Sequence, residues 1–147
     1  MEPCQIAGLD RLEAAGYLPV LRALAMSHTC SVWWWDDTGL VGRTILHNGT
    51  MVFVNIGSAT LAITASHVYQ QYLIDKAEYS EPMCQVGNVR IELERYLAWS
   101  SEKLDIAIFA FPPVLIAGTG VTVHNAGMWP PSRLKEGDLV IAGGYPG

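Results

Sequence analysis

The sequence predicts a mainly β protein, a closed antiparallel β-barrel that short N-terminal helices precede. From about Cys30 onward, short apolar or alternating runs are separated by turn-forming glycine, asparagine and aspartate residues. Two of these runs, Thr60–Ala65 and Ile106–Phe111, are apolar nearly throughout, so we expect protein to cover both of their faces. Short antiparallel strands with such buried members favour a barrel.

Residues 1–29 predict a helical lead-in that packs on the barrel. Leucines recur at near-helical spacing in this segment, at Leu9, Leu12, Leu18, Leu21 and Leu24. Gly16 and Pro19 divide the pattern into two short helices. Residues 30–147 then form the predicted β domain, since a chain of 147 residues is long enough for one domain with a substantial core.

Seven strands follow from the apolar runs and from the turn residues between them. Their expected ranges are Ser31–Trp35, Thr50–Asn55, Thr60–Ala65, Asn88–Glu94, Ile106–Phe111, Val121–His124 and Asp138–Ala142. In Asn88–Glu94 apolar residues alternate with charged ones, as one buried and one solvated face require. The expected turns include Asp37-Thr38-Gly39, Asn48-Gly49 and Ile56-Gly57-Ser58.

Three successive tryptophans, Trp33, Trp34 and Trp35, lie on the first expected strand. Neighbouring side chains on a strand point to opposite faces, so the three rings do not all enter one core. At least one ring therefore needs a second surface. We expect the N-terminal helices to provide it, and a platform for a partner or ligand is the alternative.

Charge and cysteine content exclude several classes of function. Nine Lys and Arg against fourteen Asp and Glu give a net charge of −5, with no basic cluster, so nucleic acid is not an expected partner. Cys4, Cys30 and Cys84 share no close spacing and predict free thiols rather than disulfides or a zinc site. We expect no cofactor and no metal, and the sequence does not predict an oligomeric state.

The N-terminus and the apolar segments predict a cytoplasmic protein without a membrane span. The opening MEPCQIAGLDRLEAAG has acidic residues where a secretory signal has basic ones followed by an apolar run. A charge-free stretch over residues 106–132 is long enough to cross a bilayer. Prolines, glycines and a histidine interrupt it, however, and disfavour a span.

Two ionisable residues stand at the ends of the apolar strands. His67 follows Thr60–Ala65, where its imidazole would lie at the rim of the barrel. Asp105 precedes Ile106–Phe111, where a carboxylate beside an apolar strand needs a hydrogen-bonding or charged partner. Taken singly, each has a simpler structural explanation, as a hydrogen-bonded histidine or as an aspartate that caps a turn.

Taken together, these positions resemble the trypsin-like serine peptidases, which have the double-barrel chymotrypsin fold. In that family a Thr-Ala-Ala-His motif closes one strand of the first barrel, and an Asp-(Ile/Leu)-Ala-(Ile/Leu) motif opens a later one. The matching stretches are Thr64-Ala65-Ser66-His67 and Asp105-Ile106-Ala107-Ile108. An upstream strand is similar at Gly49-Thr50-Met51-Val52-Phe53-Val54, and an early second-barrel loop at Gly143-Gly144-Tyr145-Pro146-Gly147.

The resemblance covers about residues 31–147 and implies a serine endopeptidase whose substrates are peptides or proteins. It implies that His67 is the general base and that Asp105 receives its Nδ1 proton and orients the ring. Met51 and Ser66 stand where the family usually has glycine and alanine. Neither change alters the strand-and-turn pattern around His67.

No nucleophile is assigned within the 147 residues. In the family the serine follows the Gly-Tyr-Pro-Gly region, in a Gly-Asp-Ser-Gly-Gly type of loop whose amides also form the oxyanion hole. No Gly-x-Ser-Gly occurs here, and Ser132 lacks flanking glycines. We therefore expect the first barrel and the beginning of the second from a longer peptidase, with a serine or cysteine nucleophile beyond Gly147.

Two other classes of function remain as alternatives. One is a catalytically inactive, protease-like binding or scaffold module, for which the tryptophan run would supply a contact surface. The other is a metal enzyme that uses His47, His67 and His124. No pair of these histidines has a close ligand spacing, which disfavours the metal enzyme.

Overall fold

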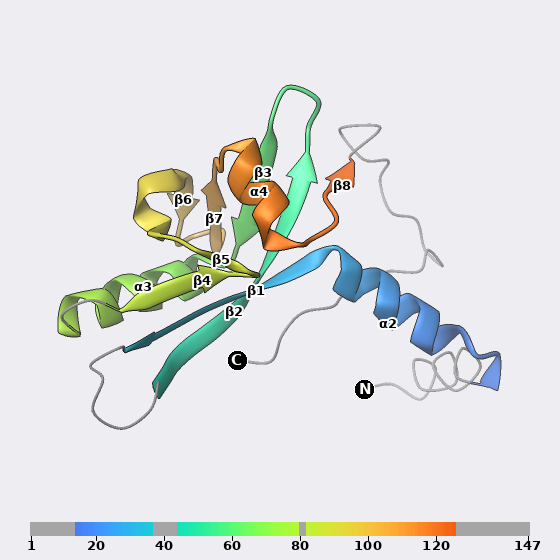
Figure 1. Ribbon diagram of the computed structural model, residues 1–147, viewed down its shortest axis with the longest axis horizontal. Coiled ribbons are helices and arrows are strands. Elements are labelled where there is room, and N and C mark those ends of the chain that lie inside the picture. Colours follow the sequence, from blue (N-terminus) through green and yellow to red (C-terminus); the bar gives the residue numbers. More distant parts are fainter. Residues whose placement is uncertain (1–13, 37–43, 80–81, 126–147) are drawn as a thin grey trace.

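The computed structural model describes residues 14–36, 44–79 and 82–125 (Figure 1). Its elements run in chain order as α2 (Tyr17–Ser27), β1 (Thr29–Asp36), β2 (Thr44–Asn55), β3 (Thr60–Thr64), α3 (Ser66–Glu78), β4 (Met83–Val86), β5 (Val89–Arg90), the 3-10 helix η1 (Leu93–Tyr96), β6 (Leu97–Ser101), β7 (Ile106–Phe109), α4 (Pro113–Thr119) and β8 (His124–Asn125). The fold is mainly β with a few short helices, as the sequence predicts.

The strands form one eight-stranded, open sheet in the order β5-β4-β1-β2-β3-β7-β6, with antiparallel neighbours along this path. The long strand β2 pairs with β1 from Thr44 to Val52 and with β3 from Val52 to Asn55. Val52 has a partner in both strands, so β1 and β3 lie on opposite edges of β2. Beyond Val52, β8 pairs in parallel with the edge that β1 leaves.

A short connection between the two terminal strands of this order bends the sheet. Only residues 91–96 separate the end of β5 from the start of β6, and four of them form η1. Seven Cα-to-Cα steps reach about 25 Å at full extension. Six strand spacings in a flat sheet would amount to about 29 Å. The sheet therefore curls, so that its two edge strands approach each other.

Alternate residues of the central strands point into one hydrophobic core. In β1 these are Val32 and Trp34, and in β2 they are Met51 and Phe53. Helices α3 and α4 and the turn η1 add apolar side chains to the same cluster, namely Tyr69, Tyr72, Leu93 and Ile116. Burying a large apolar side chain contributes roughly 1.5–3 kcal/mol, which makes this cluster the main source of stability.

The tryptophan run does need a second surface, as its position on a strand predicts. Trp34 lies in the core, whereas Trp33 stacks on Trp35 with ring centroids 4.6 Å apart. The Arg90 guanidinium lies 5.7 Å from the Trp35 ring centroid. Trp34 and Trp35 are fully buried, so the alternative of an exposed platform is wrong for both. Of the two N-terminal helices expected to cover the run, α2 (Tyr17–Ser27) contacts β1, and the first falls outside the described residues.

Helix α2 agrees with the second of the two expected N-terminal helices, and the first falls outside the described residues. It leads directly into β1, which it contacts. One stripe of the helix, Tyr17, Val20 and Leu24, is exposed. Among the helices that the structure describes, none is long and apolar enough to cross a membrane.

Four expected strands are present, three with small shifts of their ends and one, Thr50–Asn55, as the second half of a longer strand. Ser31–Trp35 lies within β1, Thr50–Asn55 lies within β2, and Thr60–Ala65 and Ile106–Phe111 contain β3 and β7. Of Val121–His124, only the last residue belongs to a strand, β8. The expected strand Asp138–Ala142 and the expected turn at residues 37–39 fall outside the described residues.

The expected strand Asn88–Glu94 is wrong over most of its length. Only Val89 and Arg90 form β5, and the backbone then turns into η1. Leu93 is fully buried while Glu92 is exposed, so the alternation correctly indicates the buried side chains. It does not indicate strand pairing, because the chain must turn here to reach the opposite edge of the sheet.

The expected turn at Asn48-Gly49 is also wrong, since both residues lie within β2 and pair with β1. The expected turn at Ile56-Gly57-Ser58 is confirmed, and it connects β2 to β3. Gly57 adopts φ +91 there, and its N–H donates to Asn55 Oδ1 at 2.7 Å.

Candidate functional site

His67 and Asp105, the two residues that the sequence singles out, are in direct contact. His67 is the second residue of α3, just after β3, and Asp105 immediately precedes β7. The β3–β7 ladder brings the two together, with Thr64 opposite Ala107. As a result, His67 Nδ1 lies 2.8 Å from Asp105 Oδ2, across 38 positions of sequence.

Asp105 binds the backbone of His67 as well as its ring. The His67 N–H donates to Asp105 Oδ1 at 2.9 Å. This N–H belongs to the first turn of α3, where backbone N–H groups have no partner within the helix. The N-cap residue, Ala65, supplies no side-chain acceptor. Asp105 therefore caps α3 from another part of the chain while it orients the imidazole.

The backbone at Asp105 turns so that its carboxylate faces the start of α3. Asp105 has φ +51, and it is the one non-glycine residue with positive φ in the described ranges. Aspartate tolerates this left-handed conformation better than most residues. The Asp105 N–H donates to the Glu102 carbonyl at 3.1 Å and closes the turn between β6 and β7. Backbone strain of this kind is often concentrated at functional sites.

Hydrogen bonds from the start of α3 lower the pKa of Asp105. The backbone N–H of His67 has the largest effect, the His67 ring follows, and the backbone N–H of Ser66 adds to both. The partial positive charge at the helix N-terminus favours the carboxylate in the same way. Asp105 is therefore ionised near neutral pH, which is the state that orients an imidazole and stabilises its protonated form.

The His67–Asp105 pair opens to solvent, with side chains that are 73% and 52% exposed. Both residues line an open hollow of about 350 Å³, together with Ser66, Gln70, Gln71, Ile74 and Glu102. Because Nδ1 of His67 contacts Asp105, Nε2 is the ring nitrogen left to exchange a proton with a reactant. The arrangement can therefore act as a general base.

A second histidine–aspartate pair lies near the other end of α3, and sequence reasoning missed it. Asp75 is 4% exposed. Its Oδ2 accepts hydrogen bonds from His47 Nδ1 at 2.8 Å and from Trp34 Nε1 at 2.7 Å, and its Oδ1 accepts one from Gln71 Nε2 at 2.9 Å. The helix buries Ser66, Tyr69, Tyr72 and Asp75, and their three-residue spacing is only a weak sequence signal because two of the four are polar.

Burial of Asp75 by itself would raise the pKa of this carboxyl. The hydrogen bonds from Trp34, His47 and Gln71 outweigh that effect, and the pKa is lowered. Asp75 is thus a buried carboxylate whose charge is compensated by three donors from β1, β2 and α3.

The histidines of the metal-enzyme alternative are not brought together. His47 contacts Asp75, His67 contacts Asp105, and His124 packs edge-on against His28 with ring centroids 5.6 Å apart. Within residues 14–36, 44–79 and 82–125, no three His, Cys, Asp or Glu side chains are placed to hold a metal ion.

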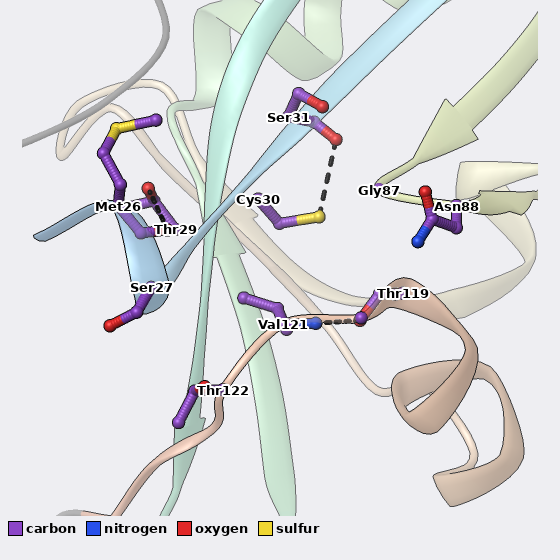
Figure 2. Close-up of a pocket in the computed structure, with 11 residues that line it drawn as sticks. Met26, Ser27, Thr29, Cys30, Ser31, Gly87, Asn88, Thr119, Val121 and Thr122 are labelled. Atoms are coloured by element: carbon purple, nitrogen blue, oxygen red, sulfur yellow. Dashed lines mark hydrogen bonds between the residues drawn. The ribbon is translucent and has the colours of Figure 1, made fainter. Parts of the chain in front are cut away.

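A second hollow, of about 360 Å³, lies between the end of α2, the β4–β5 turn and the end of α4 (Figure 2). Burial raises the pKa of the Cys30 thiol in it to about 11, so the thiol stays protonated; its Sγ lies 3.6 Å from the Ser31 carbonyl oxygen. The Thr119 hydroxyl donates to the Ile116 carbonyl at 2.7 Å. The thiol of this hollow is therefore not an activated nucleophile.

Cys30 and Cys84 are free thiols, as the sequence predicts, and Cys4 falls outside the described residues. Burial raises the pKa of Cys84 to about 12. Both thiols thus behave as small apolar core residues.

Comparisons with protein-family models, with curated proteins and with solved structures found no match to this chain. Three features of the structure bear on function: the paired His67 and Asp105, their positions at the ends of β3 and β7, and the curled sheet that carries them.

Proposed function

We propose that this chain is the histidine- and aspartate-bearing portion of a trypsin-like serine endopeptidase that hydrolyses peptides or proteins. The observation that carries the proposal is the 2.8 Å contact between His67 Nδ1 and Asp105 Oδ2. The strand-end positions of the two residues, one just after β3 and the other just before β7, support the proposal. Their contact through Nδ1 is the geometry that the Ser-His-Asp mechanism uses.

The curled sheet supports the finer proposal of a first chymotrypsin-like barrel. The short connection through η1 draws β5 and β6 toward each other, and Leu93 on this connection is fully buried. A sheet that curls around one core places strand ends at a common rim, where side chains from distant parts of the chain converge. His67 and Asp105 occupy such positions.

In the proposed reaction, His67 acts as the general base at Nε2. The ring accepts the proton of an attacking hydroxyl while the hydroxyl oxygen bonds to the carbonyl carbon of the scissile peptide. Asp105 keeps Nδ1 protonated and stabilises the imidazolium. The proton then passes from Nε2 to the leaving amine as the carbon–nitrogen bond breaks. Water, deprotonated by the same nitrogen, then attacks the acyl carbon, and the acyl–oxygen bond breaks as the proton returns to the nucleophile oxygen.

The mechanism also needs a hydroxyl nucleophile and backbone N–H donors for the oxyanion. The 147 residues contain no Gly-x-Ser-Gly, and the hydroxyl of Ser66, which lines the hollow, is buried. The proposal therefore requires further polypeptide to supply both groups. The same polypeptide would cover the exposed pair, exclude water and strengthen its electrostatic interactions.

A fluorophosphonate probe tests this proposal on the protein expressed from its intact natural gene. We expect one serine to be labelled, in a Gly-x-Ser-Gly context beyond residue 147. His67→Ala should abolish labelling, whereas Glu102→Gln, a change in the same hollow, should keep it. A folded product in which no serine is labelled would refute the serine peptidase and leave a cysteine-nucleophile relative or a protease-like binding module. Of the tryptophan run expected as that module's contact surface, Trp34 and Trp35 are buried and Trp33 is half-buried.

A further inference from the structure

We propose that Asp75 is a positioning residue for His67: it anchors α3 to β1 and β2 and so holds the helix in the rotation that brings His67 to Asp105. The catalytic meaning of this inference rests on the proposed function, but its geometric content does not. The first step is the anchor itself. Asp75 accepts hydrogen bonds from Trp34 of β1 and from His47 of β2, and its side chain is 6% exposed.

The hydrogen bonds to Asp75 can form only when α3 lies in one position relative to β1 and β2. A buried carboxylate is tolerated only when its oxygens are hydrogen-bonded, because an uncompensated buried charge is strongly destabilising. Trp34 is itself fully buried, and its ring packs edge-on against Tyr72 of α3 at 5.7 Å between centroids. The indole N–H therefore presents a fixed donor, and α3 must place Asp75 against it.

The second step is the path from Asp75 to His67 along the helix. His67, Gln71 and Asp75 follow one another at intervals of four residues, so they share one face of α3. Gln71 connects the two ends, because it lines the hollow with His67 and donates to Asp75 at 2.9 Å. The eight residues from His67 to Asp75 amount to about 12 Å of helix, so a rotation of the helix at Asp75 also moves His67.

The His67–Asp105 contact is sensitive to rotation of α3. Asp105 is fixed from the other side, by the β6–β7 turn that closes on Glu102. A ring about 6 Å from the helix axis moves by about 2 Å when the helix rotates by about 20°. A displacement of this size breaks a hydrogen bond of 2.8 Å between Nδ1 and Oδ2.

Glu94 offers the competing explanation, because it too holds α3. The Tyr72 hydroxyl donates to Glu94 Oε2 at 2.9 Å, and Lys76 forms an ion pair with the same carboxylate. These contacts tie the helix to η1 rather than to β1 and β2, through residues that do not line the hollow. If Glu94 alone positioned the helix, loss of Asp75 would leave His67 in place.

The experiment is nitrogen NMR of the His67 ring in the 147-residue chain, with the ring neutral. The nitrogen shifts report which ring nitrogen carries the proton, and Asp105→Ala gives the shifts of an unpaired ring. We expect Asp75→Ala to move the His67 shifts at least half of the way to the Asp105→Ala values. Asp75→Asn should keep them near wild type, because its oxygen still accepts from Trp34 and His47 and the Gln71 amide can turn to present its oxygen.

Two further proteins keep the test decisive. Ile116→Ala removes core volume in α4, so it should lower stability without moving the His67 shifts. If Asp75→Ala does not fold, the double variant His47→Ala/Gln71→Ala replaces it, and it should move the shifts in the same direction but less. Unchanged His67 shifts in the folded anchor variant would overturn the inference, and so would an equal shift in Ile116→Ala. A failure of fluorophosphonate labelling would refute the peptidase and leave these shifts unaffected.

Discussion

The carboxylate of Asp105 contacts the ring of His67 with one oxygen and the His67 N–H with the other. An asparagine at this position has one acceptor oxygen and, in place of the second oxygen, an NH2 group that only donates. If the oxygen caps the helix, the amide faces Nδ1 and forces the proton to Nε2, which is the wrong tautomer for a general base. The two contacts together explain why this position requires a carboxylate.

The proposed function therefore predicts that Asp105→Asn in the protein from the intact natural gene lowers kcat for peptide hydrolysis by about four orders of magnitude, the effect expected when the orienting carboxylate of a Ser-His-Asp triad is lost. Far-ultraviolet circular dichroism should show an intact fold. Peptide hydrolysis measured with purified protein checks this. Hydrolysis within tenfold of wild type would show that Asp105 does not orient the base.

At the scale of residues, the sequence indicated which residues form the candidate site but not how their atoms contact each other. His67 and Asp105 could be identified because each breaks the end of an apolar strand and together they match the spacing of a known motif. The helix-capping hydrogen bond and the positive φ of Asp105 depend on where α3 begins relative to the β6–β7 turn. No local pattern contains that information.

At the scale of elements, α3 is the largest feature that the sequence did not predict. Its buried positions are taken by Tyr69, Tyr72 and Asp75, with Ser66 at its first turn, so few strongly apolar residues mark its buried face. Hydrophobic periodicity is a weak signal for such a helix. Tertiary hydrogen bonds that the carboxylates of Asp75, Glu94 and Asp105 accept, rather than an apolar stripe, fix where it lies.

These three carboxylates predict that the chain loses stability in acid. The pKa of each is lowered in the fold, so each contributes stability above the ordinary pKa of about 4 and loses it as the pH falls through the lowered value. Urea unfolding of wild type should give a smaller free energy at about pH 3 than at pH 7. Asp75→Asn should lose less over this interval, since its side chain does not titrate, and parallel profiles would contradict the assignment.

The contact between α3 and β2 predicts a second stability effect. A Cβ added at Gly49 would lie 2.6 Å from Cγ1 of Val68, the residue that follows His67. Gly49→Ala should therefore lower the free energy of unfolding by roughly 1–3 kcal/mol. In the Val68→Ala background, Gly49→Ala should lower the free energy of unfolding much less, because the contacting methyl groups are gone. Equal losses from Gly49→Ala in the two backgrounds, measured by denaturant titration, would show that contact with Val68 does not cause the loss.

The same contact explains the wrong turn at Asn48-Gly49. An Asn-Gly pair between apolar runs is the strongest short-range signal for a hairpin. Here the glycine serves close packing of α3 on β2, and the strand continues through it. Only tertiary packing distinguishes the two uses of glycine.

For the whole molecule, the sequence predicted a closed antiparallel barrel from buried strands and turn spacing. The described residues confirm a mainly β fold, but their strands form an open sheet, and the sequence did not predict the order of these strands. The turn into η1, which carries the chain from β5 to β6, begins within Asn88–Glu94, the run that the sequence presents as a continuous strand. The alternation in Asn88–Glu94 indicates the same buried side chains whether the backbone continues as a strand or turns into η1. The choice is made by the need to join the two edges of the sheet.

Leu93 holds the connection between β5 and β6 against the sheet, because its side chain is fully buried in the hydrophobic core. Leu93→Ala should lower the free energy of unfolding by about 2–5 kcal/mol. Ile91→Ala, at a half-buried position of the same connection, should cost clearly less. Equal losses in urea titrations would show that the connection is not held by Leu93.

The contact between His67 and Asp105 carries the proposed function, and the ring nitrogens of His67 report on it most directly. In the neutral ring of wild type, we predict that the proton resides on Nδ1, where it is donated to Asp105. In Asp105→Ala this preference should be lost, with a clear change in both nitrogen shifts. Identical nitrogen shifts in the two proteins would contradict the contact, and with it the assignment of His67 as a general base.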